Sequence, residues 1–390
     1  MNGLIHEQSV IVGVDAHKYS HTAAALNAWG QPLGRLDFTN DSLPVCLSWL
    51  STLGSHEDVI VAVEDANSYG WHLVTALTRH QFAIRSVPAV LTERDRKHST
   101  SRDKSDYEDA RRVAKVILTK YEETLPIMAS IANSEELATA TELNLLLNER
   151  RDIVKEQTAL KNQLHGLLHR YYGDHYADDF PKCFHQKALA FYEQDLSLNA
   201  AAKTASPNID ELTLLAQSII RRIQRLKLLE LQAAAILKHI YQVGQASPQA
   251  AALYENIHGC GLLTASAMMA EIVTIRRFNG KEKLAKYAGI APMLKSSGAH
   301  HRLHTNPFGN RLLNKALHTV ALSQIAIKGD DRGKVYYQKK LQEGKTKLWA
   351  LRCLKRRLIN LVFQTLKRAE KGLADASLNP AANNQEKTAS

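Results

Sequence analysis

The sequence predicts an α/β unit at the start of the chain and a mostly helical remainder, a fold class of α/β plus α. Short apolar runs rich in β-branched residues alternate with helical patterns over residues 1–125. Leucine and isoleucine then recur at helical spacing over residues 134–241, and shorter helical patterns follow from residue 252. A chain of 390 residues is long enough for two or three such units.

Residues 1–125 are expected to form the first domain, which is built on a mixed sheet. The expected strands are residues 10–14, 22–26, 35–38, 59–63 and 82–87, and the expected helices are residues 44–50, 71–79 and 106–118. Gly30 marks a turn between the second and third strands. The chain is therefore expected to open on a hairpin-rich sheet.

Residues 130–250 are expected to form a second region made of two long helices. One helix is expected over residues 134–172 and the other over residues 209–241. The intervening residues 173–208 are expected to be irregular because they contain two prolines. Two long helices joined by an insert predict an antiparallel coiled hairpin, which serves as a spacer or as a dimer surface.

Residues 252–374 are expected to form a third, mostly helical domain that begins with a Gly-x-Gly turn. Gly259 and Gly261 precede an expected helix over residues 262–272. Backbone N–H groups exposed ahead of a helix can hold a phosphate, and an ordinary tight turn is the alternative reading. The terminal residues 375–390 are small, polar and asparagine-rich, so a disordered tail is expected there.

The positive charge of the chain gathers near its C-terminal end. The net charge is +11 at pH 7, and between His300 and Leu373 there are 17 lysines and arginines against four acidic residues. The rest of the chain therefore carries no excess of positive charge. This concentration favours a phosphate-rich partner, and a solubilising basic surface is the alternative.

Cysteine usage and hydropathy argue against a secreted or membrane protein. The cysteines are Cys46, Cys183, Cys260 and Cys353. They lie far apart without a paired spacing, which argues against a zinc knuckle or a disulfide framework and fits a reducing cytoplasm. No apolar run approaches the roughly 18 to 20 residues of a membrane helix, and the first residues lack the pattern of a secretory signal. A cytoplasmic protein that does not span a membrane is expected.

Four carboxylates stand where expected strands end or an expected helix begins. Asp15 and Glu64 end strands, and Asp106 and Asp109 lie one helical turn apart on one face. Gathered at one edge of a sheet, they would repel one another unless a cation neutralised them. Oxygen ligands in this number suit Mg²⁺, or Mn²⁺, and a pair of such ions assists phosphoryl transfer. The alternative is that each is an ordinary strand-end or helix-start acid.

The order of these features resembles the RNase H-like fold of RuvC-type nucleases. More closely, it resembles the DEDD transposases of insertion sequences, the family that includes the Piv invertase and the bridge-RNA-guided recombinases. Residues 13–18 are similar to the first motif of that family, Glu64 with Tyr69 to the second, and residues 104–111 to the third. The segments similar to its C-terminal motifs are residues 257–261, 287–292, 296–298 and 306–318.

The resemblance implies a DNA transposase or site-specific recombinase with a composite site. It implies that the four carboxylates hold Mg²⁺, while Ser297 attacks the scissile phosphodiester and becomes transiently linked to DNA. Ser297 lies eight residues after Gly289, where the catalytic serine of the family is expected. Ser296 is its nearest rival, and an ordinary loop is the alternative reading of both serines.

The resemblance also implies an element-encoded noncoding RNA that pairs with donor and target DNA in a bacterial cytoplasm, at the nucleoid. Base pairing then selects the sequence, and the protein needs mainly contacts with the sugar-phosphate backbone of the nucleic acids. The expected nucleic-acid contacts are Lys104, Arg111, Gly259, Gly261, Arg302, Asn310, Arg311, Lys315, Arg352, Lys355, Arg356 and Arg357. Tyr336, Tyr337 and Trp349 would stack on bases or, in the alternative reading, pack in the core.

Two other functions compete with this one. A RuvC-type structure-specific nuclease would use water as the nucleophile, and a nucleic-acid-binding scaffold would have no catalysis. A recombinase must cut two strands on each of two DNA partners, which implies four active sites. A homo-oligomer, as a dimer of dimers, is therefore expected, with residues 134–241 as the assembly surface.

Overall fold

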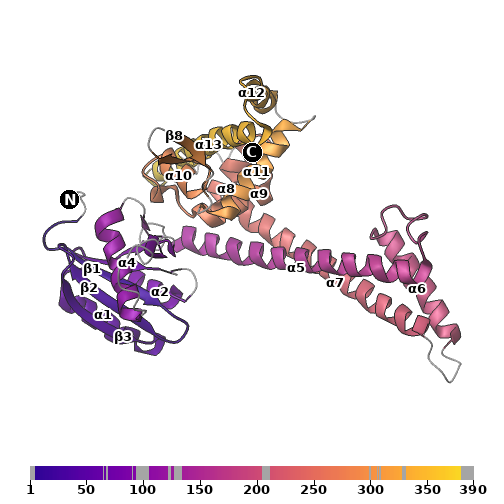
Figure 1. Cartoon of the computed structure of the whole chain (residues 1–390), viewed down its shortest axis with the longest axis horizontal. Coiled ribbons are helices and arrows are strands. Elements are labelled where there is room, and N and C mark those ends of the chain that lie inside the picture. Colours follow the sequence, from indigo (N-terminus) through magenta and orange to yellow (C-terminus); the bar gives the residue numbers. More distant parts are fainter. Residues whose placement is uncertain are drawn as a thin grey trace, which may run out of the picture.

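The computed structural model of the chain contains three successive units (Figure 1). The described residues are 5–64, 66, 69–89, 91–93, 105–121, 124–126, 134–203, 211–297, 300–304, 306, 309–326 and 331–378. A sheet with its helices comes first, a pair of long helices follows, and a mostly helical unit comes last. Among these residues, no helix combines the length and the apolar composition that a membrane span requires.

The first unit is built on a six-stranded mixed sheet with the order β3-β2-β1-β4-β5-β6. Its strands are β1 (Val10–Ala16), β2 (His21–Asn27), β3 (Pro32–Phe38), β4 (Val59–Val63), β5 (Ala83–Ser86) and β6 (Leu125–Pro126). The first three strands form an antiparallel meander, β4 is parallel to β1, and β5 is parallel to β4. Every residue of β4 is buried, as expected for a central strand that is covered on both faces.

Helices cover both faces of this sheet. Helices α1 (Leu43–Leu53) and α2 (Trp71–Arg79) pack on one face, and α4 (Asp106–Lys120) packs on the other. Neighbouring residues of β1 alternate between the two apolar cores, so Val12 belongs to the first core and Ile11 to the second. The expected order of strands and helices in this unit is confirmed, and the short strand β6 is an addition that the sequence did not predict.

Helix α4 lies very close to β1 at Gly13. A Cβ atom at this position would lie 2.1 Å from the carbonyl oxygen of Ala110 and 2.4 Å from the backbone nitrogen of Ala114. Only a glycine in the strand, facing small residues in the helix, permits this approach. The approach brings the first turn of α4 close to Asp15, whose charge interacts with that of Asp109.

The second unit is a pair of long antiparallel helices, α5 (Ser134–Tyr172) and α7 (Glu211–Ala246). The ion pairs Glu156–Arg225 and Glu142–His239 join the two helices. The later residue of α5 pairs with the earlier residue of α7, as the antiparallel arrangement requires. Figure 1 shows the pair extending away from the C-terminal unit and ending at α6. The two expected long helices are confirmed.

The expectation for the insert between these helices is wrong in part. The sequence predicts an irregular segment over residues 173–208, whereas residues Gln186–Lys203 form helix α6. Leu189 and Tyr192 of α6 are buried against α5 and α7 at the far end of the pair. Phe191 of the same helix is exposed, so apolar residues are not confined to one face and the helical periodicity is weak.

The third unit has a helical core that also contains Leu143 of α5 and Ile240 of α7, so it encloses the base of the long pair. Its elements are α8 (Pro248–Asn256), α9 (Leu262–Ile272), α10 (Lys281–Tyr287), β7 (Met293–Ser297), β8 (His300–His304), α11 (Arg311–Ile325), α12 (Asp331–Gln342) and α13 (Lys347–Leu378). Helix α13 continues to Leu378, so the expected disordered tail is wrong for residues 375–378. Residues 379–390 lie outside the described residues.

Candidate functional site

Asp15 and Glu64 lie at the same edge of the sheet. Strands β1 and β4 are parallel neighbours, and Val14 pairs in register with Val63, so the next residue of each strand leaves at the same end. The backbone N–H of Glu64 donates to the carbonyl oxygen of Val14 over 3.5 Å. The side chain of Asp15 is 16% exposed, so its carboxylate is largely removed from water.

The first turn of α4 brings two more carboxylates to this edge. Ser105 is the N-cap of the helix, and its hydroxyl accepts a hydrogen bond from the backbone N–H of Glu108 over 3.2 Å. Asp106 and Asp109 follow on one face of this capped turn. Oδ1 of Asp109 accepts a hydrogen bond from Nη1 of the buried Arg112 over 2.5 Å, which fixes the orientation of this carboxylate.

His17 lies between Asp15 and Asp106. Its Nε2 atom is 3.1 Å from Oδ2 of Asp15 and 3.8 Å from Oδ1 of Asp106. One ligand atom from each of these three residues lies within 4.8 Å of the other two, which makes them a candidate metal group. His17 was not among the expected site residues, although its place two residues after a strand-end carboxylate is the signal that points to it.

A cavity of about 290 Å³ opens beside these groups. It is lined by Asp15, His17, Glu64, Ala89, Thr92, Glu93 and Asp109. Three of the four expected carboxylates therefore line one cavity, and Asp106 contacts the same group through His17. Glu93 is an additional carboxylate that the sequence did not single out, because no motif or strand end marks its position.

The surroundings of Asp15 raise the pKa of its carboxyl group above the ordinary range. Burial is the largest cause, and the negative charges of Asp109 and Asp106 add to it. The charge and the hydrogen bond of His17 act in the opposite direction. A bound cation would also favour the ionised form, so the electrostatics of this edge suit a metal ion.

Some expected nucleic-acid contacts are already paired within the chain. Nη1 of Arg111 lies 3.5 Å from a carboxylate oxygen of Glu108, and Nη2 of Arg356 lies 3.7 Å from one of Glu282. Lys104 lies outside the described residues. The role of these three residues stays a prediction.

Ser297 is the last residue of β7 and lies near the tip of an antiparallel hairpin. It pairs in register with His300 of β8, and Ser296 pairs with His301. Arg302 follows in β8. The four carboxylates belong to the first unit and both candidate serines to the third, so a site that used both groups would be composite.

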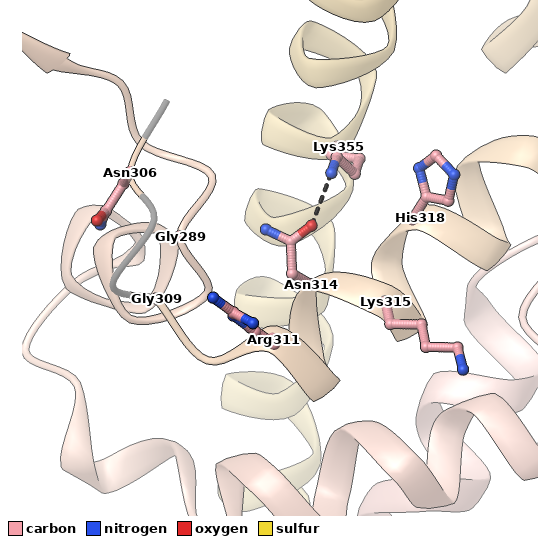
Figure 2. A pocket seen from close by; sticks show the side chains of 8 residues that line it. All are labelled: Gly289, Asn306, Gly309, Arg311, Asn314, Lys315, His318 and Lys355. Atoms are coloured by element: carbon pink, nitrogen blue, oxygen red, sulfur yellow. Dashed lines mark hydrogen bonds between the residues drawn. The ribbon is translucent and has the colours of Figure 1, made fainter. Parts of the chain in front are cut away.

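A second cavity, of about 410 Å³, lies beside α11 (Figure 2). It is lined by Gly289, Asn306, Gly309, Arg311, Asn314, Lys315, His318 and Lys355. Arg311, Lys315 and Lys355 were expected to contact nucleic acid, and the structure brings all three to this cavity. Asn314 and His318 were missed, although they follow Arg311 at helical spacing and share its face of α11.

The turn before α11 packs tightly against the end of α10. Gly289 has a φ of +67°, and a Cβ atom at Gly309 would lie 2.1 Å from the Cα atom of Gly289. Asn310 is the N-cap of α11, and its Oδ1 accepts a hydrogen bond from the backbone N–H of Leu313 over 2.8 Å. The backbone N–H of Asn310 donates to the carbonyl oxygen of Tyr287 over 2.6 Å.

The side chain of Asn310 also ties this turn to α9. Its Nδ2 donates to Oε2 of Glu271 over 2.5 Å and to the hydroxyl of Tyr287 over 3.1 Å. Burial raises the pKa of Glu271, while the Asn310 hydrogen bond and the charges of Arg151 and Arg277 lower it. Asn310 was expected to contact nucleic acid, and in the structure its side chain is engaged by these internal hydrogen bonds.

Lys355 reaches the second cavity from α13. Its Nζ donates to Oδ1 of Asn314 over 2.7 Å, and Nδ2 of Asn314 donates to the carbonyl oxygen of Ala288 over 2.7 Å. Burial, followed by the charge of Arg352, lowers the pKa of Lys355. Burial, followed by the charge of Lys355, lowers the pKa of His318. The ammonium group of Lys355 is therefore only partly solvated by water in this cavity.

The Gly-x-Gly segment forms the connection between α8 and α9. Gly259 has a φ of +75°, and a Cβ atom there would lie 3.0 Å from the hydroxyl oxygen of Ser323. Nε2 of Gln324 donates to the carbonyl oxygen of His258 over 2.8 Å, which ties the turn to α11. Gly261 is the N-cap of α9. Phosphate binding by this segment stays a prediction.

Cation–aromatic contacts mark the basic surface of α12 and α13. The guanidinium of Arg352 lies 5.2 Å from the ring centre of Trp349, and that of Arg357 lies 5.1 Å from the ring centre of Tyr336. Tyr336 and Tyr337 are partly buried and pack against the core of the third unit. This packing favours a structural role for the two tyrosines over stacking on bases.

Two parts of the chain match models of transposase families. Residues 12–173 match a DEDD model of the IS110 type, described as Transposase, and residues 251–338 match the Transposase IS116/IS110/IS902 family. An uncharacterized 43.6 kDa protein of insertion element IS110 from Streptomyces coelicolor is 34% identical over 110 residues, which are 28% of this chain and 27% of that protein.

Two further relatives come from the same genus. An uncharacterized 44.8 kDa protein of insertion element IS116 from Streptomyces clavuligerus is 30% identical over 157 residues, 40% of this chain and 37% of that protein. The mini-circle putative transposase for IS117 from Streptomyces coelicolor is 31% identical over 169 residues, 42% of this chain and 39% of that protein. The chain thus spans well under half the length of the curated relatives it matches.

Proposed function

Because the chain belongs to the IS116/IS110/IS902 family of transposases, we propose that it is the transposase of an insertion element and that it cuts and rejoins DNA. The observation that carries the proposal is the convergence of Asp15, Glu64 and Asp109 on one cavity. Carboxylates gathered in this way are the usual setting for metal-assisted phosphoryl transfer. The basic residues of α11 and α13 offer a separate surface to the DNA backbone.

The topology of the first unit supports an RNase H-like fold of the RuvC type. An antiparallel meander, β1 to β3, continues into parallel strands with β1 in the middle of the sheet. Asp15 stands at the end of this central strand, Glu64 at the end of its parallel neighbour, and Asp109 on the helix that packs across β1. This is the arrangement that the resemblance to DEDD transposases implies.

The residues at this edge fit Mg²⁺, with Mn²⁺ as the alternative. The four carboxylates would supply the oxygen ligands, and His17 either adds a nitrogen ligand or orients Asp15 through their 3.1 Å contact. When bound, such an ion polarises the phosphodiester and stabilises the charge that develops on its oxygens. Arg112 would keep Asp109 in position for the ion through its hydrogen bond.

Ser297 is proposed as the nucleophile. A bond forms between its Oγ and the scissile phosphorus while a bond from phosphorus to one DNA oxygen breaks, which leaves a phosphoserine and a hydroxyl end. The hydroxyl proton of Ser297 passes to a carboxylate, directly or through water, and the leaving oxygen gains a proton. Attack by a hydroxyl end of the partner strand then breaks the phosphoserine and rejoins the DNA.

Guidance by an element-encoded noncoding RNA and assembly as a dimer of dimers are parts of the same proposal. The basic third unit supports the first part, because it suits backbone contacts with paired strands. Exposed leucines on the long helices, Leu145, Leu228 and Leu231, support the second part. Action on DNA would place the protein at the nucleoid of a bacterial cytoplasm.

The proposal is tested with Asp15→Asn, a labelled duplex that carries the element ends, the element RNA and Mg²⁺. Loss of the central carboxylate is expected to lower the rate of cleavage and strand transfer by at least about 100-fold. Asp152→Asn is the matched control, because Asp152 is an exposed residue of α5. An undiminished product yield from Asp15→Asn would point instead to the nucleic-acid-binding scaffold.

A further inference from the structure

We propose that the cavity beside α11 is a subsite that holds one backbone phosphate of a nucleic acid without cutting it, with Lys355 as a principal contact. The inference rests on the proposed function, because it names a second place at which the protein holds its polyanionic substrate. The ligand chemistry is a phosphodiester, which DNA and RNA can both supply. Single strands of DNA and of RNA are therefore tested separately.

One face of α11 supplies much of the positive charge of this cavity. Arg311, Lys315 and His318 follow one another at spacings of four and three residues, so they lie along the same side of the helix. Figure 2 shows them around the cavity, with Lys355 on the neighbouring helix. The N-terminus of α11 adds the partial positive charge of its first backbone N–H groups. None of the eight residues that line the cavity is acidic.

Lys355 is held in position before a ligand arrives. Asn314 accepts one of the three N–H groups of its ammonium over 2.7 Å, and Asn314 is itself anchored to the carbonyl oxygen of Ala288. Burial lowers the pKa of Lys355 and of His318. A phosphate oxygen at this place would compensate the charge of the Lys355 ammonium, which the interior solvates poorly, and would favour the protonated form of His318.

The turn that forms one wall of the cavity is closely packed. Gly309 is pressed against the backbone of Gly289, and a side chain at Gly309 would overlap it. The hydrogen bond from Asn310 to the buried Glu271 ties the same turn to α9. A site whose walls are fixed by the fold loses little entropy when a ligand binds, so the cavity suits a preformed anion site.

The position of the cavity in the chain relates it to the serine-bearing hairpin. Gly289 lies four residues before the start of β7, and Asn306 lies two residues after the end of β8. The hairpin of β7 and β8, which carries Ser297 at the end of β7, therefore begins and ends close in sequence to residues that line the cavity. A strand whose phosphate is held here would be anchored beside the hairpin, which is a positioning role and not a catalytic one.

The test uses inorganic phosphate and the full-length protein in the absence of metal. The ring signal of His318 is observed by NMR after selective labelling of histidine, and it is assigned by its loss in His318→Gln. Phosphate is expected to shift this signal with saturation in wild-type protein. Lys355→Met is expected to weaken the apparent affinity by at least about tenfold, and Lys345→Met, which changes an exposed lysine, is expected to leave it unchanged.

A second variant and a salt control accompany the phosphate titration. Arg311→Gln, which changes an exposed side chain, is expected to weaken phosphate binding as well, and it serves if Lys355→Met fails to fold. Sodium chloride at matched ionic strength corrects for general salt effects. No saturating shift of His318 with phosphate, or a shift of the same affinity in Lys355→Met and in Arg311→Gln, would overturn the proposal.

The DNA and RNA arms use 20-nucleotide single strands of the same sequence. The strand that reproduces the phosphate-induced shift, and loses it in Lys355→Met, identifies the source of the phosphodiester. Failure of both strands to shift His318 would overturn the assignment to nucleic acid. None of these measurements needs metal, Ser297 or cleavage, so failure of the recombinase mechanism would leave their result unchanged, and the two failures are distinguishable.

Discussion

Gly13 of β1 and Ala110 of α4 approach so closely that a Cβ atom at Gly13 would lie 2.1 Å from the Ala110 carbonyl oxygen. Strand and helix are therefore joined through their backbones, and the turn of α4 that carries Asp106 and Asp109 is held close to Asp15. The carboxylate site thus depends on a position that carries no functional group.

Gly13→Ala is expected to force α4 away from β1. The added methyl group meets backbone atoms, which cannot move aside as a side chain can, so we expect a loss of about 2 to 4 kcal/mol in the free energy of unfolding. Urea denaturation measures it. Gly166→Ala is the matched control: it lies in a helix with open space around its Cβ position and should be neutral or slightly stabilising. Equal stabilities for the two variants would contradict the packing argument.

Asp15→Asn is expected to abolish the binding of Mn²⁺ at this edge, as measured by calorimetric titration, because the carboxylate of Asp15 interacts with His17, Asp106 and Asp109. His17→Gln distinguishes the two roles of His17. A ligand role predicts a drop in Mn²⁺ affinity of roughly tenfold or more, and a role in orienting Asp15 predicts a smaller change. If Asp15→Asn bound Mn²⁺ with unaltered affinity, the metal site could not lie at this edge of the sheet.

Two of the four carboxylates, Asp109 and Asp106, are expected to differ in what they contribute to stability. Asp109→Asn leaves the buried guanidinium of Arg112 without its charged partner, so we expect a loss of about 2 to 3 kcal/mol in the free energy of unfolding. The side chain of Asp106 is 59% exposed, so Asp106→Asn should change stability by less than about 0.5 kcal/mol. Chemical denaturation of both variants checks the contrast, and equal losses would refute it.

The buried Glu271 predicts a pH dependence of stability. Its pKa is raised above 4.5, chiefly by burial, so the folded state binds this proton more tightly than the unfolded state does. The resulting stabilisation is present below pH 4.5 and is lost as the pH rises through the raised pKa.

Glu271→Gln is the variant that isolates this effect. It keeps an oxygen that can accept the hydrogen bond from Asn310, but it does not titrate. The stability of the wild type relative to this variant should therefore fall as the pH rises from 4.5 through the raised pKa of Glu271. Urea denaturation over that range measures the difference. A difference that stays constant with pH would show that the pKa of Glu271 is the same in the folded and unfolded states.

Local patterns in the sequence were sufficient to predict most elements and the positions of the four carboxylates at strand ends and on the first turn of a helix. Strands that are buried on both faces read as continuous apolar runs, so Asp15 and Glu64 were marked by the points at which those runs stop. Helical spacing placed Asp106 and Asp109 on one face. Helix α6 was missed because its exposed face is also partly apolar.

What the sequence did not reveal depends on contacts between distant segments. Lys355 and Asn314 are 41 residues apart, and their hydrogen bond exists only because α13 packs beside α11. The cavity wall requires the approach of Gly289 to Gly309, which no local periodicity encodes. His17 was visible in a motif, but its position between two carboxylates follows from the packing of α4 on β1.

Ser297 is proposed to attack DNA at a site completed by the carboxylates of the first unit. The most direct measurement incubates the protein with radiolabelled donor DNA, the element RNA and Mg²⁺, and separates the products on a denaturing protein gel. Label that migrates with the wild-type protein, and is absent with Ser297→Ala or without metal, is the predicted result. Cleaved DNA without protein-linked label, in equal yield from Ser297→Ala, would contradict the claim and indicate a RuvC-type nuclease that uses water.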